Sequence, residues 1–316
     1  MDSILIMILS ILLSLVSVKV LINILIKLKF GQPIREEGNK EHYKKAGTPT
    51  MGGIAFIIVF TILSMIFVKF DASLVFILLS TLSFGAIGLL DDLEKIAKKQ
   101  NMGLTERQKL ILQFATSFVL ITVFYFLLKE DIGILETPLF KLRISLGVFA
   151  IPILMFIMVG SVNAVNFTDG LDGLLSSVSI PIFLGIHFIA LLDNPSVAMT
   201  SLIFAGALIG FLWFNSYPAS IFMGDVGSMA IGGAIVAMLI TLNKPLYYAI
   251  IGGVYLVEAL SVVIQRVYFR KTDGKRIFLM SPIHHHYELK GYKETKIVSA
   301  FMIVSILLTL ITIYII

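Results

Sequence analysis

Long apolar runs separated by short polar breaks dominate the pattern of this chain. A helix that crosses a bilayer needs about 20 mostly apolar residues. None of the runs alternates polar and apolar positions with a period of two, as the strands of a membrane barrel would. The pattern therefore predicts an all-α, polytopic integral membrane protein, a single transmembrane domain over residues 1–316. About ten transmembrane helices are expected, at roughly 4–28, 51–69, 73–90, 110–128, 146–162, 173–192, 196–214, 229–243, 246–269 and 297–316.

Composition supports the membrane assignment. Hydrophobic residues make up 58% of the 316 residues and charged residues only 14%, whereas a soluble domain carries about 25% charged residues. A single soluble core stops growing at about 250–300 residues, so lipid must replace water around most of this chain. The sequence has no cysteine, which rules out a disulfide, a thiolate metal site and a cysteine nucleophile.

The basic residues predict the orientation of the helices. The stretches 27–50, 91–109 and 266–296 hold six, five and eight Lys or Arg residues, nineteen in all, against five in the connections on the opposite side. Because cytoplasmic loops of membrane proteins carry an excess of Lys and Arg, these three stretches are expected in the cytoplasm. Both termini are then expected outside.

Polar residues that could carry chemistry gather in the connections expected to be cytoplasmic. The first group is Asp91 and Asp92, just past the third predicted span. Two adjacent carboxylates at a helix junction can hold Mg²⁺ or act as a base. Helix capping is the alternative, since Asp favours helix ends. These two residues alone leave both interpretations open.

A second group lies between the fifth and sixth predicted spans, where Asn163, Asn166, Asp169 and Asp172 interrupt an apolar region. On a helical turn, Asp169 and Asp172 would share one face because they are three residues apart. The glycines in this stretch allow a phosphate or another backbone to approach closely. A plain turn between two spans requires neither two Asn nor two Asp, so a functional site is the favoured interpretation.

The third group is Asn215 followed by the stretch from Phe222 to Ser228, which contains Asp225 between two glycines. Ser228 is expected to open the next helix. A carboxylate at a helix N-terminus suits a metal ion that bridges phosphates, with backbone N–H groups toward the anion. A glycine-rich turn with a capping Asp is the alternative.

The fourth group is three successive histidines, His284, His285 and His286, in the last cytoplasmic stretch. Neighbouring residues point in different directions in a helix or a strand, so all three cannot pack in one core. A zinc site would require more widely spaced ligands. Phosphate binding and proton transfer fit better, because histidine titrates near neutrality.

Basic residues accompany these groups, among them Lys45, Lys95 and Lys109. The excess of positive charge on the cytoplasmic side explains most of them without a substrate. Near paired phosphates, a lysine can also act as a point charge. The only ionisable residues expected near the bilayer midplane are Lys19, His187 and Glu258, which are expected to serve helix packing. A transporter would place more such residues there.

Together these motifs resemble the phospho-N-acetylmuramoyl-pentapeptide transferases, within the polyprenyl-phosphate N-acetylhexosamine 1-phosphate transferase superfamily. The resemblance extends in order from the loop at 30–50 to the end of the chain. It rests on Gly47-Thr48-Pro49-Thr50-Met51-Gly52-Gly53, Asp91-Asp92, the stretch from Asn163 to Gly173, Phe222-Met223-Gly224-Asp225, and the stretch from Pro282 to Gly291 that contains the histidines.

The resemblance implies roles for individual residues. Asp225 would bind Mg²⁺, and Asp92 or the Asp91–Asp92 pair would orient or deprotonate a lipid phosphate. The histidines would lie beside the phosphates or the sugar-peptide and take part in catalysis. The residues implied in substrate binding are Lys45, Thr50, Lys95, Lys109, Asn163, Asn166, Asp169, Asp172, Asn215, Phe222, Ser228 and Gln265, with Phe222 stacking on uracil.

The resemblance also implies the reaction and the partners. Undecaprenyl phosphate would attack UDP-N-acetylmuramoyl-pentapeptide at the cytoplasmic face of a bacterial plasma membrane, giving lipid I and UMP. A Mg²⁺ cofactor and a homodimer are implied, and no nucleic acid partner. A sister enzyme that transfers N-acetylglucosamine 1-phosphate is the nearest alternative, and a transporter is the alternative from another class. A direct displacement and a covalent aspartyl intermediate both remain open.

Overall fold

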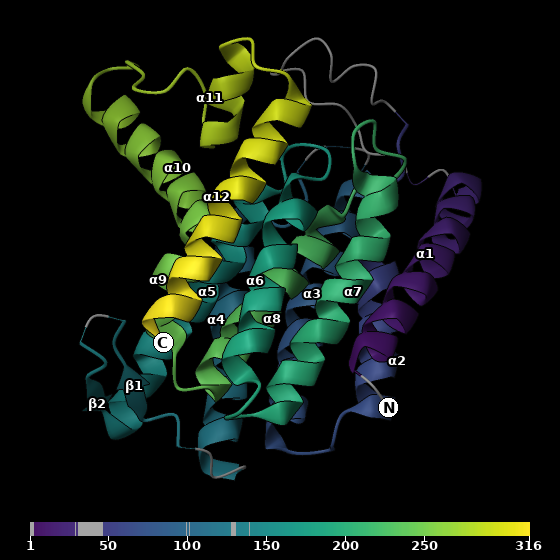
Figure 1. Cartoon of the computed structure of the whole chain (residues 1–316). Coiled ribbons are helices and arrows are strands. Elements are labelled where there is room, and N and C mark those ends of the chain that lie inside the picture. The colour runs from purple at the N-terminus through teal and green to yellow at the C-terminus, as the bar shows by residue number, and fades with distance from the viewer. Residues whose placement is uncertain are drawn as a thin grey trace.

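The computed structural model describes residues 3–28, 30, 47–98, 100, 102–127, 131–138 and 140–316. Helices make up most of this part of the chain and strands only six residues of it, so the predicted all-α class is confirmed (Figure 1). The helices are α1 (Ser3–Leu28), α2 (Gly53–Phe67), α3 (Ala72–Lys98), α4 (Glu106–Thr122), α5 (Ala150–Thr168), α6 (Leu174–Ala190), α7 (Pro195–Asn215), α8 (Gly224–Thr241), α9 (Tyr248–Ile251), α10 (Gly253–Lys271), α11 (Ile283–Leu289) and α12 (Glu294–Ile315).

The lengths of these helices confirm a polytopic membrane protein. Among the described residues, seven helices are long and apolar enough to cross a membrane, or eight if the bent pair formed by 245–251 and α10 is one span. The apolar helices α2 and α6 are shorter. Each of the ten predicted runs corresponds to a helix or to that bent pair, whereas a total of ten membrane crossings stays a prediction.

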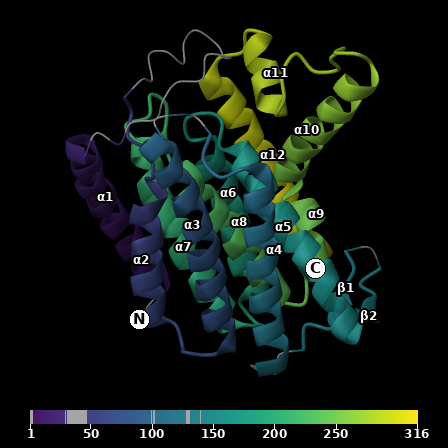
Figure 2. The same ribbon diagram turned by 180° about the vertical axis from the view of Figure 1, so that it is seen from behind.

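Helix α8 forms the centre of the bundle. It packs against α3 on one side and α5 on the other, while α7 contacts α1 and α6, and α6 contacts α12. Figures 1 and 2 show α1 at one edge of the bundle and α10 at the other. The outer faces of α1 and α12 expose apolar side chains, as helices in contact with lipid should.

Small polar side chains hold α1 to α7. The Ser10 hydroxyl donates to the carbonyl oxygen of Ile203 at 2.7 Å, and the Ser14 hydroxyl donates to that of Ala207 at 2.6 Å. Lipid gives apolar helices no hydrophobic reason to associate, so close packing and such hydrogen bonds must hold them together. The serines in this first apolar run therefore mark its buried face.

The starts of α2 and α8 meet through two glycines. A Cβ atom added to Gly53 would lie 2.3 Å from the Cα of Gly227, which is too close for any real side chain. Two backbones can approach this closely only where both residues lack a side chain. This contact brings the chain around residues 49–53 next to the first turn of α8.

The ninth predicted span, 246–269, is a bent pair of helices and not the one continuous helix that was predicted. A short 3₁₀ turn (Pro245–Tyr247) and α9 end at Gly252, and α10 continues at an angle of 82°. Sharp bends in helices occur at Pro or Gly, and the break falls at the pair Gly252 and Gly253. As a result α10 leaves the bundle at a steep angle (Figure 1).

Two short antiparallel strands, β1 (Ile134–Glu136) and β2 (Arg143–Ser145), follow α4 and its one-turn π-helical end (Val123–Leu127). Sequence patterning missed them because three residues are too few to show an alternation. The hairpin is tied to the bend of the ninth span: the Tyr247 hydroxyl donates to Oε1 of Glu136 at 2.9 Å, and the Glu136 N–H donates to the Asn243 carbonyl oxygen at 3.1 Å.

Candidate functional site

Asp91 and Asp92 lie inside α3, not in a loop after it. The apolar run ends near residue 90, but the helix continues to Lys98. Helix-forming residues and ion pairs one turn apart extend it, including Lys95 Nζ with Asp91 Oδ2 at 2.7 Å. The prediction that the helix ends at 90 was wrong, and the two carboxylates are consequently held on a rigid helix.

Asp92 caps a helix, but not its own. Its Oδ2 accepts a hydrogen bond at 3.1 Å from the backbone N–H of Val226, in the first turn of α8. Asp91 Oδ1 accepts one at 2.9 Å from the N–H of Leu104, just before α4. Both carboxylates are almost fully buried. The capping alternative is therefore confirmed for Asp92, which caps α8. The contacts of the two residues bring the starts of α4 and α8 to the end of α3.

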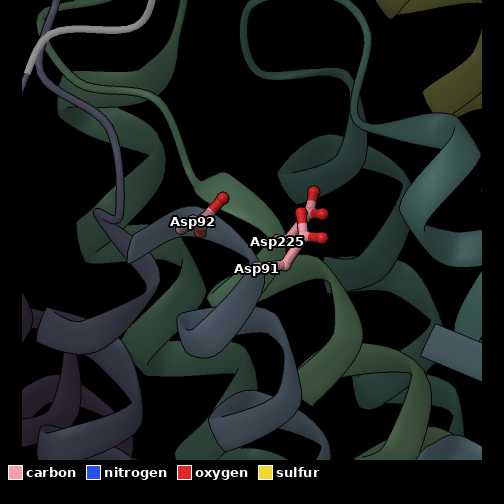
Figure 3. A group of neighbouring side chains, drawn as sticks. All are labelled: Asp91, Asp92 and Asp225. Carbon is pink, nitrogen blue, oxygen red and sulfur yellow. The ribbon is translucent and has the colours of Figure 1, made fainter. Parts of the chain in front are cut away.

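Asp225 joins this pair from the first turn of α8, as its position between two glycines predicted. One oxygen from each of Asp91, Asp92 and Asp225 lies within 4.8 Å of the others. Figure 3 shows the side chains of Asp91 and Asp225 pointing toward the same place, with Asp92 beside them. Residues more than 130 positions apart in sequence thus form one acidic cluster.

Two lysines neutralise most of this charge. Lys95 Nζ lies 2.7 Å from Asp91, 3.4 Å from Asp92 and 3.0 Å from Asp225. Lys109 Nζ, from the first turn of α4, lies 2.7 Å from Asp225 and 3.2 Å from Asp91. The three acidic side chains thus share two ammonium groups. The two predicted phosphate-binding lysines are therefore placed at the acidic cluster.

Asn166 fixes the orientation of Asp225. Its amide nitrogen donates to Asp225 Oδ1 at 2.9 Å and to the Ser228 hydroxyl oxygen at 2.8 Å. Both amide hydrogens are thereby used, although the resemblance implied a contact with the nucleoside. Ser228 does not open α8, which begins four residues earlier at Gly224; it lies within that helix, facing Asn166.

Asp169 follows the last residue of α5 and lies close enough to the acidic cluster to interact with it. Burial, and then the charges of Asp225 and Asp92, raise its pKa to about 8. A carboxyl group with such a pKa keeps its proton at neutral pH unless a cation enters the site. The second group of the sequence therefore adds a titratable acid to the first and third groups.

Asp169 and Asp172 do not share a helical face, so this prediction was wrong. The α5 helix ends at Thr168 and the residues after it form a turn. Asp172 is buried, and its Oδ2 accepts a hydrogen bond from the Ala219 N–H at 2.9 Å. Its own backbone N–H donates to Oε1 of Glu294 at 2.6 Å. Asp172 therefore ties this turn to the loop after α7 and to α12.

The stretch at 49–53 is hydrogen-bonded to the loop that precedes α8. The N–H of Phe222 donates to the Pro49 carbonyl oxygen at 2.8 Å, and the N–H of Gly52 donates back to the Phe222 carbonyl oxygen at 2.9 Å. These bonds place buried Thr50 close in the fold to half-buried Phe222. The prediction for Lys45 lies outside the described residues.

Three of the predicted substrate-binding amides already make structural contacts. Asn163 on α5 pairs with Gln113 on α4, donating to its Oε1 at 2.7 Å. Asn215 accepts from the Ser176 hydroxyl at 3.1 Å and donates to the Ile221 carbonyl oxygen at 3.0 Å. The Gln113 partner was missed because nothing in the sequence separates it from other polar residues near a helix start.

Gln265 is the third of these amides. Its Nε2 donates to the carbonyl oxygen of Phe278 at 3.0 Å, and its Oε1 accepts from the N–H groups of Ile277 and Phe278 at 3.1 and 3.0 Å. It thus holds the loop after α10 in place. It also lines a cavity of about 610 Å³ between α10 and the segment that leads into α11, which places it at the edge of an open space.

The three histidines lie on the short helix α11 and point in different directions, as expected. His284 is fully buried, whereas His285 and His286 are partly exposed. His285 Nδ1 is 2.6 Å from Glu288 Oε2, and His286 Nδ1 accepts a hydrogen bond from the Leu279 N–H at 3.0 Å. The ring of His284 lies against Gly170, in the turn after Asp169. This contact joins the fourth group to the second.

The donor atoms of the acidic cluster fit a magnesium ion. Mg²⁺ prefers oxygen ligands and is commonly bound by one or two carboxylates together with phosphate oxygens and water. The cluster offers three carboxylates. The ammonium groups of Lys95 and Lys109 contact these carboxylates, which shows that a positive charge is favourable among them. Asp225 with Asp91 or Asp92 is the set of residues that would hold the ion.

Comparison with known proteins assigns the family. The model of glycosyl transferase family 4 matches residues 74–243, and a phospho-N-acetylmuramoyl-pentapeptide-transferase signature matches residues 45–57. A phospho-N-acetylmuramoyl-pentapeptide-transferase of Halalkalibacterium halodurans is 44% identical over 98% of this chain and 95% of its own length. One of Clostridium perfringens is 47% identical over 91% of this chain and 90% of its own. The chain therefore belongs to glycosyl transferase family 4 and, within it, to the phospho-N-acetylmuramoyl-pentapeptide-transferases.

Proposed function

We propose that the protein transfers phospho-N-acetylmuramoyl-pentapeptide from its UDP donor to undecaprenyl phosphate at the cytoplasmic face of a bacterial plasma membrane, giving lipid I and UMP. The observation that carries the proposal is the cluster of three carboxylates and two lysines at helix ends, in a chain whose relatives bear this enzyme name over nearly their full length. A membrane enzyme suits this reaction because the acceptor is a lipid and the donor is soluble.

The chemistry is a phosphoryl transfer, which requires mainly positioning and charge stabilisation. An oxygen of the lipid phosphate forms a bond to the sugar-linked phosphorus. The bond from that phosphorus to the bridging oxygen breaks, and UMP leaves with the electron pair. One pyrophosphate link replaces another, so no ATP is required. Mg²⁺, held by Asp225 and Asp91, would offset the negative charge of the reacting phosphates.

The lysines and Asp92 have separate tasks in this proposal. Lys95 and Lys109 bridge the carboxylates and are placed to turn toward phosphate oxygens when a cation takes their position. Asp92 Oδ2 is held by the start of α8, and its Oδ1 accepts from Lys95 at 3.4 Å. Once Lys95 turns toward a phosphate, Oδ1 would orient the lipid phosphate or accept its remaining proton. A lipid monophosphate is already a nucleophile, so we propose a single displacement without a covalent aspartyl intermediate.

The test uses purified protein, radiolabelled UDP-N-acetylmuramoyl-pentapeptide and undecaprenyl phosphate, with Mg²⁺ or with EDTA. We expect equal amounts of UMP and lipid product with Mg²⁺ and neither with EDTA. Product from UDP-N-acetylglucosamine in place of the pentapeptide donor would favour the sister activity. Flux of either substrate into liposomes without product would favour a transporter. A stoichiometric burst of UMP in lipid-free protein, absent in Asp92→Asn, would contradict the single displacement.

A further inference from the structure

A buried acid and a buried histidine form a pair that the proposed reaction has not used. Glu258 lies in the first half of α10 and His284 at the start of α11, and both are 0% exposed. Oε1 of Glu258 lies 3.1 Å from Nδ1 of His284. The sequence assigned Glu258 to helix packing, yet burial of a carboxyl group is unfavourable unless the group has a partner. An apolar residue would pack there at no such cost.

The two residues retain one unsatisfied atom each. Within the described part of the chain, Oε2 of Glu258 and Nε2 of His284 have no hydrogen-bond partner, although both atoms are buried. Buried polar atoms are hydrogen-bonded in the great majority of cases, so each exception requires an explanation. The pair is therefore joined at one end, while the nitrogen on the far side of the imidazole ring is buried without a polar partner.

That free nitrogen faces the turn that carries Asp169. A Cβ atom on Gly170 would lie 2.1 Å from Nε2 of His284, closer than any side chain tolerates. Glycine at 170 is thus what allows the ring to reach the turn. A ring N–H pointing at the Cα of Gly170 would be a buried donor without an acceptor, whereas an unprotonated ring nitrogen leaves only a lone pair there.

We propose that Glu258 is a positioning residue for the donor-binding site. Its carboxylate accepts a hydrogen bond from Nδ1–H of His284, which keeps the ring proton on Nδ1 and lets the unprotonated Nε2 edge of the ring pack on Gly170. The ring thereby holds the turn that carries Asp169 in place for the nucleotide sugar. Partners of this kind commonly set the tautomer and orientation of functional histidines. The inference rests on the proposed function for the identity of that ligand.

The kinetic test compares Glu258→Leu with Glu258→Gln, whose amide oxygen can still accept from Nδ1–H. Glu258→Leu should lower kcat/KM for the donor by about 10- to 100-fold, the range for loss of such a supporting contact, with the KM for the lipid acceptor unchanged. Glu258→Gln should recover most of the activity. Glu106→Leu, at an exposed acid on α4, is the matched control and should have wild-type kinetics.

A double-mutant cycle with His284→Gln tests whether Glu258 acts through that ring. If it does, the double variant should lose no more activity than His284→Gln alone. Losses that multiply would overturn the inference, as would equal inactivity of Glu258→Gln and Glu258→Leu in proteins with wild-type melting temperatures.

The tautomer is measured without turnover. The chain has five histidines, so a ¹⁵N-histidine NMR spectrum compared with that of His284→Gln isolates the signals of His284. We expect a protonated Nδ1 and an unprotonated Nε2 in the wild type, and loss of this pattern in Glu258→Leu. A proton on Nε2 in the wild type would overturn the inference even if Glu258→Leu does not fold. If the expected pattern appears but the donor is not used, the positioning role stands and the proposed function fails.

Discussion

Asp225 is the residue on which most contacts of the site converge. Its Oδ2 accepts hydrogen bonds from Lys95 and Lys109, and its Oδ1 accepts one from Asn166. These partners come from α3, α4 and α5, so the side chain is held in one orientation before any ligand binds. Such preorganisation is what a phosphoryl-transfer site requires, because the groups that stabilise charge must already be in place.

Asp225→Asn should therefore abolish activity while leaving the fold intact. The amide keeps the size of the side chain but removes the charge that would balance a cation. The expected loss in kcat is at least about 100-fold, or ~3 kcal/mol. The measurement is lipid-product formation over a series of Mg²⁺ concentrations, with Asp193→Asn, at an exposed acid between α6 and α7, as the control. Near-normal turnover at limiting Mg²⁺ would refute the metal assignment.

Asp169 gives the apo protein a pH-dependent stability. Its pKa is 3.8 in an unfolded chain and about 8 in the folded one, owing to burial and to the charges of Asp225 and Asp92. Between these values the folded protein keeps a proton that the unfolded chain has released, so the free energy of unfolding falls as pH rises from about 4 to about 8.

This contribution is absent in Asp169→Asn. Without metal, the melting temperature should therefore fall between pH 5 and pH 8 by a few degrees less in Asp169→Asn than in the wild type. Thermal melts in detergent at several pH values measure the difference, with Asp193→Asn as the control. Saturating Mg²⁺ should narrow the gap, because a cation offsets the charges that raise the pKa. Identical pH profiles for wild type and Asp169→Asn would contradict the placement of Asp169 beside the cluster.

The elements show what the sequence could predict and where physical reasons limited it. The apolar runs predicted where the helices lie, because a helix surrounded by lipid must be apolar over most of its length. The same criterion stopped α3 at residue 90, since it cannot recognise a helix that continues into water on ion pairs such as Lys95 with Asp91. It also read 246–269 as one helix, because Gly252 and Gly253 do not interrupt the apolar run although they permit a bend of 82°.

Among the candidate site residues, the charged ones could be predicted from the sequence and the contacts of the amides could not. Asp91, Asp92, Asp225, Lys95 and Lys109 were all predicted, and the fold brings them together. Amides were harder to interpret, because an Asn beside a site can bind a ligand or a neighbour equally well. The pairing of Asn163 with Gln113 and the use of Asn215 as a loop clamp depend on distances between helices. No local pattern contains that information.

The glycine contact between α2 and α8 predicts a stability effect. Gly53→Ala places a methyl group 2.3 Å from the Cα of Gly227, so the two backbones must separate, at a cost of about 1–3 kcal/mol. Gly160→Ala is the matched control, since a Cβ there meets nothing within 4 Å. It should be neutral or stabilise α5 by about 0.5–1 kcal/mol. Melting temperatures of both variants check this; equal values would contradict the close approach.

At the scale of the whole molecule, the site lies at one end of the bundle. Contacts of Asp91, Asp92 and Asp225 join the end of α3 to the starts of α4 and α8. The ring of His284, on α11, packs on Gly170 in the turn after α5. The hairpin β1–β2 is attached instead to the bend of the ninth span. The charge asymmetry of the sequence predicts that the first end is cytoplasmic and the second is outside.

This orientation can be tested directly, because the chain has no native cysteine. Single cysteines replace two exposed lysines, Lys275 after α10 and Lys141 in the hairpin. A maleimide that cannot cross membranes should label Lys141→Cys in intact cells, and should label Lys275→Cys only after permeabilisation. The reverse pattern would overturn the orientation and place the site on the wrong side for a soluble nucleotide donor.

The lysines that bridge the three carboxylates have a thermodynamic consequence. On the proposed function, a divalent cation that enters the cluster would displace the ammonium groups bound there. Those groups would then need an anion, which a diphosphate would supply. Cation and donor should then bind cooperatively, each raising the affinity for the other by the same factor, as linkage requires. Titration of Mn²⁺ by electron paramagnetic resonance should show tighter binding when UDP is present. Without donor, the enzyme would hold little metal. A change in the cellular magnesium concentration would therefore alter the rate of cell-wall synthesis only when donor is present.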